Sequence, residues 1–125
     1  IETIKDQKLF NNIIRNGKFT KNNFFVIYNI RKEETGINYG IAISNKVGNA
    51  VLRNRLKRQT RALIDNHRNL FKNNHNYIIM IRKTCKEAEF KDMNNAFKSG
   101  MNIMQAVSIV ENFFVVKQQI SPILP

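Results

Sequence analysis

The sequence predicts one α+β domain, a two-layer sandwich in which a β-sheet packs against helices. Segments with apolar residues at helical spacing alternate along the chain with short runs that are rich in aromatic and β-branched residues. No Pro-, Gly- or Ser-rich linker and no internal repeat interrupts the 125 residues, of which 42% are apolar. A chain of this length buries roughly two thirds of its unfolded surface, so neither a disulfide nor a metal is needed to hold the fold.

Residues 5–16 are predicted to form the first helix. Apolar side chains recur there on one side, at Leu9, Phe10, Ile13 and Ile14. Gly17 follows directly, and glycine is the commonest residue just past a helix end. The first helix is therefore expected to end at this glycine.

A β-hairpin is predicted next. Residues 23–31 are rich in aromatic and β-branched side chains, which favour strands. Residues 33–38, around Gly36, have the composition of a turn, and residues 39–44 continue as the second strand. Phe24 and Phe25 must point to opposite faces of the first strand, and the sequence leaves open which of them joins the core.

The second helix is predicted over residues 50–66. Asn49 can cap it, because the short side chain accepts a backbone N–H, and Gly48 permits a tight turn from the preceding strand. An apolar stripe is expected along Leu52, Leu56 and Leu63, with Val51 and Ala62 beside it.

A central strand and a closing helix complete the predicted order of helix, two strands, helix, strand, helix. Residues 77–81, Tyr-Ile-Ile-Met-Ile, form a continuous apolar run of strand length. The closing helix follows residue 86, although Gly100 lowers its helix propensity. Its stripe comprises Phe90, Met93, Phe97, Met101 and Met104.

The C-terminal segment is less defined by its sequence. Residues 106–125 are treated as an extension of the single domain 1–125, and they could lengthen the helix, add a strand or dock on a partner. Pro122 and Pro125 predict an irregular end, because proline cannot continue a helix or a central strand.

Positive charge dominates the composition and concentrates in one segment. The chain has 21 Lys and Arg residues against 9 Asp and Glu residues, a formal charge of +12. No acidic residue lies between Glu34 and Asp65, so nothing nearby in sequence neutralises Lys46, Arg53, Arg55, Lys57, Arg58 and Arg61. A polyanion such as nucleic acid is therefore the expected partner.

Helical spacing arranges these cations in two rows. Arg53, Lys57 and Arg61 recur every four residues, and Arg55 and Arg58 form a second short row. An arginine fork can hold a phosphate through two hydrogen bonds, and the free N–H groups at a helix start form a further anion site. The helix is thus predicted to be a nucleic-acid-binding face.

Motifs for protein catalysis are not found. The only cysteine, Cys85, excludes an internal disulfide and is expected to be a small, partly buried side chain. His67 and His75 belong to no metal-binding motif, and Glu87 and Glu89 project from different sides of a helix. No segment has the composition of a signal peptide or a membrane span, so the expected compartment is the cytoplasm.

A family resemblance rests on the order of residues in the basic segment. From Gly40 the chain reads Gly-Ile-Ala-Ile-Ser-Asn-Lys-Val-Gly-Asn-Ala-Val-Leu-Arg-Asn-Arg-Leu-Lys-Arg, followed by Arg61. This run closely resembles the signature of the bacterial ribonuclease P protein subunit. The resemblance extends to Phe10 and Gly17, to residues 25–28 and to residues 77–83, and it covers about residues 5–83.

The resemblance implies an accessory protein that, with a catalytic RNA, removes the 5′ leader from precursor tRNA. The RNA performs the chemistry, and the Mg²⁺ that the holoenzyme requires is bound mainly by RNA, with no metal site or obligate protein partner assigned to this chain. The residues implied to bind the RNA subunit are Lys46, Gly48, Asn49, Arg53, Asn54, Arg55, Lys57, Arg58 and Arg61. A cleft between the first helix and the sheet is implied to take the leader, at Phe10, Ile14 and Tyr28.

The resemblance also implies a fold related to that of a ribosomal protein domain, with a left-handed βαβ crossover where a right-handed one is the rule. Two positions depart from the family pattern: Ile14 stands where a second aromatic is common, and Asn45 where a lysine usually precedes Lys46. Two other classes of protein are alternatives to this one: a ribosomal or other structural RNA-binding protein, and a nuclease that acts without RNA.

Overall fold

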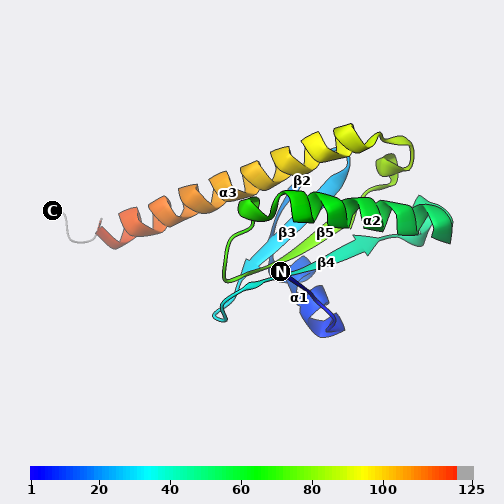
Figure 1. Cartoon of the computed structure of the whole chain (residues 1–125). Helices are drawn as coiled ribbons and strands as arrows, with labels where there is room; N and C mark the ends of the chain where they lie inside the picture. The colour runs from blue at the N-terminus through cyan, green and yellow to red at the C-terminus, as the bar shows by residue number, and fades with distance from the viewer. Residues whose placement is uncertain (121–125) are drawn as a thin grey trace.

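The computed structural model describes the backbone of residues 1–120 and the side chains of residues 1–106. Over this part of the chain, a five-stranded mixed sheet is combined with three α-helices (Figure 1). The elements in chain order are β1 (Glu2–Thr3), α1 (Gln7–Asn16), β2 (Lys18–Lys21), β3 (Phe25–Arg31), β4 (Ile37–Ile43), α2 (Ala50–Asn66), β5 (His75–Ile81) and α3 (Phe90–Ile120). Short 3-10 helices are η1 (Asn45–Val47), η2 (Arg68–Leu70) and η3 (Lys83–Glu87).

The sheet has the strand order β1-β4-β5-β3-β2. β5 lies at its centre, parallel to β4 and antiparallel to β3. β1 pairs in parallel with β4 at one edge, and β2 pairs antiparallel with β3 at the other. β4, α2 and β5 thus form a βαβ unit, and the left-handed sense implied for it stays a prediction.

The main core lies between one face of the sheet and the pair of helices α2 and α3 (Figure 1). Alternate side chains of the two central strands point into it: Phe25, Ile27, Tyr77, Ile79 and Ile81. Phe25 is completely buried, and its ring meets Phe97 of α3 edge-on, with the ring centroids 5.8 Å apart. The open question about the two adjacent phenylalanines is thereby answered: Phe25 joins the core, and Phe24 packs at its margin.

The opposite face of the sheet is only partly covered, by α1. Ile13 of α1 is completely buried there. The ring of Phe10 lies so close to Gly40 of β4 that a Cβ atom on this glycine would come within 2.8 Å of it. No helix of the described residues covers the other half of this face, which leaves room for a binding site beside α1.

The predicted α+β class and the order of the principal elements are confirmed. α2 has the predicted bounds, and Gly17 caps the C-terminus of α1 as expected. β1 and β2 are not predicted from the sequence, because a two-residue strand and the segment Lys-Phe-Thr-Lys offer little apolar surface to bury. α1 also adds a partial layer on the second face of the sheet.

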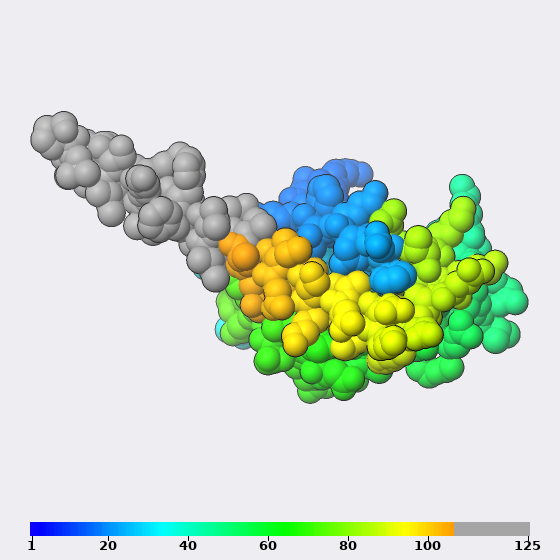
Figure 2. Space-filling view, turned by 90° about the horizontal axis from the view of Figure 1, so that it is seen from above, coloured from blue at the N-terminus to red at the C-terminus, as the bar shows by residue number. Residues whose placement is uncertain are grey.

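Gly100 does not interrupt α3, and its small size has a packing reason. A Cβ atom at this position would lie 2.8 Å from Cδ1 of Ile27 and 3.2 Å from Nδ2 of Asn22. Figure 2 shows the blue surface of β2 directly beside the yellow surface of α3. The helix backbone continues to Ile120, so the C-terminal extension lengthens the helix, whereas Pro122 and Pro125 lie outside the described residues.

Gly17 is expected to be intolerant of substitution, because a Cβ atom there would lie 2.4 Å from the carbonyl oxygen of Ile13 and 2.7 Å from that of Asn29. Both contacts are with backbone atoms, which cannot turn away as a side chain can. We expect Gly17→Ala to lower the free energy of unfolding by about 2 kcal/mol, measured by urea denaturation. Lys8→Ala on the exposed side of α1 is the control, and equal midpoints for the two variants would contradict this prediction.

Candidate RNA-binding surfaces

The segment between β4 and α2 is held by local hydrogen bonds. The side chain of Ser44 accepts the backbone N–H of Lys46 over 3.1 Å and starts η1. The side chain of Asn49 accepts the backbone N–H of Leu52 over 2.9 Å, which confirms the predicted cap of α2. These bonds fix the loop in front of the basic helix.

Gly48 and Arg53 close this loop. Gly48 has an extended backbone, so its predicted conformational freedom is not what the turn requires. A Cβ atom here would lie 2.5 Å from Cδ2 of Leu52, so a larger residue would have to displace the end of that side chain. Nη1 of Arg53 donates to the carbonyl oxygen of Gly48 over 2.5 Å, so this arginine holds the loop and keeps only its other donors for a ligand.

The exposed face of α2 carries a row that we name the basic stripe: Asn54, Arg55, Arg58 and Arg61. Within the part of the chain that has described side chains, its arginines form no ion pair. Arg53 and Lys57 are half-buried at its margins, so the second, shorter predicted row forms the centre of the exposed face. The stripe therefore presents uncompensated guanidinium groups to solvent.

The predicted position of Val51 beside the apolar stripe is wrong. Its side chain is 79% exposed, because it lies about one turn before Asn54 and Arg55 on the outer face. The buried face of α2 is formed by Leu56, Thr60, Leu63 and Ile64. The hydroxyl of Thr60 donates to the carbonyl oxygen of Leu56 over 2.8 Å, which lets a polar side chain join the core.

A cleft of about 740 Å³ occupies the half of the sheet that α1 leaves open. We name it the sheet cleft. Its floor includes Val26 and Tyr28 of β3, Ala42 of β4 and Met80 of β5. Cations surround this mainly apolar floor: Lys21, Lys46, Arg82 and Lys83. An apolar floor within a cationic rim suits a chain of unpaired nucleotides.

Phe19 of β2 contributes an aromatic surface to this cleft. It is 64% exposed, and its ring centroid lies 5.8 Å from that of Tyr28, with the planes tilted by 40°. Phe19 is not among the residues predicted to bind the leader. In the sequence it is a lone aromatic between polar residues, which does not show that its ring lies beside Tyr28. Two neighbouring rings thus border the cleft.

The residues predicted for leader binding are only partly brought together. Tyr28 lines the sheet cleft, whereas Phe10 packs on Gly40 and Ile14 is half-buried on α1. Lys46 both lines the cleft and precedes α2. The sheet cleft and the basic stripe are therefore neighbours joined through η1, and the roles given to these residues stay predictions.

The remaining reactive side chains have structural surroundings. Cys85 is completely buried, its Sγ lies 3.2 Å from the carbonyl oxygen of Phe24, and burial raises the pKa of its thiol to about 11. A ring nitrogen of His67 lies 2.8 Å from Oδ1 of Asn94. Among the described residues, no three His, Cys, Asp or Glu side chains are grouped so that they could hold a metal ion. The same residues include no helix that is both long and apolar enough to span a membrane.

Comparison with known proteins identifies the family. Residues 1–105 match the family model described as Ribonuclease P. The chain belongs to the ribonuclease P protein family. A curated relative, the ribonuclease P protein component of Bacillus cereus strain AH187, is 34% identical over 104 residues, which cover 78% of this chain and 90% of the relative.

Solved structures agree with the ribonuclease P assignment. The RNase P protein of Staphylococcus aureus is 29% identical, with a TM-score of 0.75 over 82% of this chain and 94% of that chain. A mutant of that protein with defective mRNA degradation activity has a TM-score of 0.77, with the same 29% identity, over 82% of this chain and 87% of that chain. The RNase P protein from Thermotoga maritima, 20% identical with a TM-score of 0.72 over 82% of this chain and 97% of that chain, supports the fold alone.

The predicted family resemblance is confirmed. The chain is the protein subunit of ribonuclease P, and a part in maturation of the tRNA 5′ end follows from the family. Membership also implies an RNA partner in the ribonucleoprotein.

Proposed function

We propose that this ribonuclease P protein is an accessory RNA-binding subunit with two adjoining surfaces. The basic stripe contacts the catalytic RNA, and the sheet cleft takes the single-stranded 5′ leader of precursor tRNA. The observation that carries the proposal is their continuity, because Lys46 lines the cleft and leads directly into the capped start of α2. One protein could then hold the leader while it is docked on the RNA that cuts it.

The stripe is suited to a folded RNA rather than to a small anion. Arg55, Arg58 and Arg61 are exposed side by side on a rigid helix, and each can form a two-pronged contact with a phosphate. Binding would release the counterions condensed on the RNA, which makes the affinity depend on salt. Arg53 contributes mainly by fixing the loop that precedes these side chains.

The cleft is suited to unpaired nucleotides. Bases stack on aromatic rings with little dependence on sequence, and nearby cations follow the phosphates. Phe19 provides a ring beside Tyr28, so a second aromatic is present although Ile14 lacks one. We expect the cleft to accept leaders of different sequence.

Chemistry at the scissile phosphate is assigned to the RNA. Mg²⁺ prefers oxygen ligands and often bridges phosphates. No three His, Cys, Asp or Glu side chains of the described residues are grouped as ligands, and burial raises the pKa of the Cys85 thiol to about 11. We propose that Mg²⁺ is ligated mainly by RNA oxygens, and that the protein acts by neutralising charge and positioning the substrate.

Reconstitution tests this proposal. We expect the purified protein to cleave no precursor tRNA by itself, and to lower the Mg²⁺ concentration that the ribonuclease P RNA of the same organism needs for half-maximal cleavage. The physical reason is that protein cations replace part of the Mg²⁺ that screens RNA phosphates. Cleavage is followed on precursor tRNA labelled at its 5′ end. Metal-dependent cleavage without RNA would contradict the proposal, and a protein that leaves the Mg²⁺ requirement unchanged would favour another RNA-binding role.

A further inference from the structure

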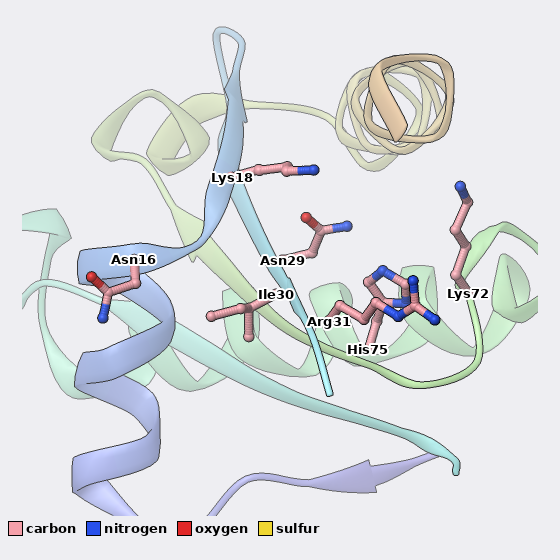
Figure 3. Close-up of a pocket in the computed structure, with 7 residues that line it drawn as sticks. All are labelled: Asn16, Lys18, Asn29, Ile30, Arg31, Lys72 and His75. Carbon is pink, nitrogen blue, oxygen red and sulfur yellow. The ribbon is translucent and has the colours of Figure 1, made fainter. Parts of the chain in front are cut away.

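A second pocket, of about 350 Å³, lies at the hairpin end of the central strands, away from the sheet cleft. Figure 3 shows the side chains that line it, which come from β2, β3, β5 and the segments next to them: Asn16, Lys18, Asn29, Ile30, Arg31, Lys72 and His75. Both sites include residues of β3: Arg31 lines this pocket, and Val26 lines the sheet cleft. At about 3.3 Å per residue, the two positions are roughly 17 Å apart, so the sites are separate.

The pocket gathers cationic and titratable side chains. Arg31 and His75 are directly paired across β3 and β5, and Figure 3 shows Lys72 on the same side of the sheet. Among the lining side chains in the described part of the chain, none is Asp or Glu. The pocket thus places the positive charges of Arg31 and Lys72 together without a carboxylate among its described lining residues, and an anion between them would be attracted to both.

The floor of the pocket is preorganised by buried polar groups. Tyr77 is 1% exposed, and its hydroxyl accepts the backbone N–H of Lys72 over 2.9 Å. Asn29 is only 3% exposed. The backbone from which the Lys72 side chain extends is thus fixed before any ligand arrives.

His75 is oriented in the same way. Its Nδ1 lies 2.9 Å from the carbonyl oxygen of Asn73, and because a carbonyl can only accept, Nδ1 is the donor. With the proton on Nδ1, Nε2 is an acceptor, and it can donate to a ligand only when it also carries a proton. The guanidinium of Arg31 and the ammonium of Lys72 are therefore the donors that match the oxygens of a phosphate, and the fixed His75 ring lies beside them.

We infer that the pocket formed by Arg31, Lys72 and His75 binds a backbone phosphate of RNA. This inference rests on the proposed function for the source of the phosphate, since RNA is the partner of this family. It adds an anchor at the opposite end of the strands from the sheet cleft. RNA that contacts the basic stripe could then be held at two ends of the molecule, which limits its rotation on the protein.

The first experiment tests the pocket without RNA. The protein has two histidines, and both ring signals can be followed by NMR while inorganic phosphate is added at constant pH and ionic strength, with chloride as the reference anion. We expect a saturable shift of the His75 signal and none of the His67 signal, because His67 lies against Asn94 and Phe97 instead. The shift should disappear in the double variant Arg31→Gln, Lys72→Gln. Absence of a saturable shift in the unchanged protein would overturn the site.

The second experiment tests the assignment to RNA. Affinity for the ribonuclease P RNA is measured over a range of salt concentrations for two double variants. The pocket variant carries Arg31→Gln and Lys72→Gln, and a charge-matched control on the exposed side of α3 carries Lys91→Gln and Lys98→Gln. We expect the pocket variant to bind about 10-fold more weakly, with a log–log salt slope reduced by about two, and the control to change little. Equal thermal unfolding midpoints for the two variants verify that the pocket variant is folded.

The outcomes separate the sources of the phosphate. If RNA-subunit affinity is unchanged but the assembled holoenzyme binds precursor tRNA more weakly, the phosphate belongs to the tRNA and the RNA assignment stands. If the variant matches the control with both RNAs, the assignment is overturned even where inorganic phosphate binds. Because the unchanged protein still stimulates the RNA in every one of these cases, such a failure is distinguishable from failure of the proposed function.

Discussion

Replacing Arg55, Arg58 and Arg61 together by alanine is expected to weaken binding of the ribonuclease P RNA about 100-fold at moderate salt. All three side chains are exposed on α2, and none is needed for the core or for the loop before the helix. Their loss removes charge-assisted contacts without creating a cavity. Affinity is measured by filter binding or fluorescence with the protein and RNA of the same organism.

The salt dependence and a matched control show whether the loss of affinity comes from lost arginine–phosphate contacts or from the lower overall positive charge. The slope of log affinity against log salt should fall by about three, because about three fewer counterions are released. The matched control removes three exposed lysines elsewhere: Lys8, Lys91 and Lys98. An equal loss of affinity in the control would show that overall charge, and not the basic stripe, determines binding.

Removing both rings from the sheet cleft is expected to affect substrates according to the length of their leader. The double variant Phe19→Ala, Tyr28→Ala loses both stacking surfaces. Its binding free energy for the leader should fall because an aromatic platform contributes about 1–3 kcal/mol per stacked base. We expect precursor tRNA with a long leader to bind the holoenzyme about 10- to 100-fold more weakly, and one with a single leader nucleotide to be nearly unaffected. Substrate affinity is compared between the two leader lengths.

Conservative changes make this test specific. Tyr28→Phe keeps the ring and should retain most of the leader affinity. Phe19 is 64% exposed, so Phe19→Ala should leave the unfolding midpoint almost unchanged. If Tyr28→Ala lowered the affinity for both leader lengths equally, Tyr28 would have to be assigned to packing of the sheet, and the cleft would lose its assigned ligand.

Local signals explain why the basic helix could be predicted so closely. Its start depends on Asn49, whose side chain bonds within its own turn, and its length follows from a sustained apolar period. β1 and β2 could not be predicted in this way, because each is defined by its pairing with a distant strand. Val51 was misplaced because its apolar side chain suggested burial, although helical spacing puts it on the outer face with Asn54 and Arg55.

The residues of the candidate sites also differ in whether they could be predicted from the sequence. Tyr28 could be proposed from the family resemblance, and it does line the sheet cleft. Phe19 could not, because nothing in the sequence shows that β2 pairs with β3 and sets this ring beside Tyr28. The pocket of Arg31, Lys72 and His75 also depends on strand register, which brings together residues from separate parts of the sequence.

The partly uncovered sheet affects the tendency of the RNA-free protein to self-associate. Phe19 beside the cleft and Val51 on α2 leave apolar surface open to water, which promotes self-association. The formal charge of +12 opposes it, because like-charged copies repel. Salt shortens the range of that repulsion to about 8 Å at physiological ionic strength. The free subunit therefore owes its colloidal stability to its positive charge, and RNA bound as we propose would cover this apolar surface while it neutralises that charge.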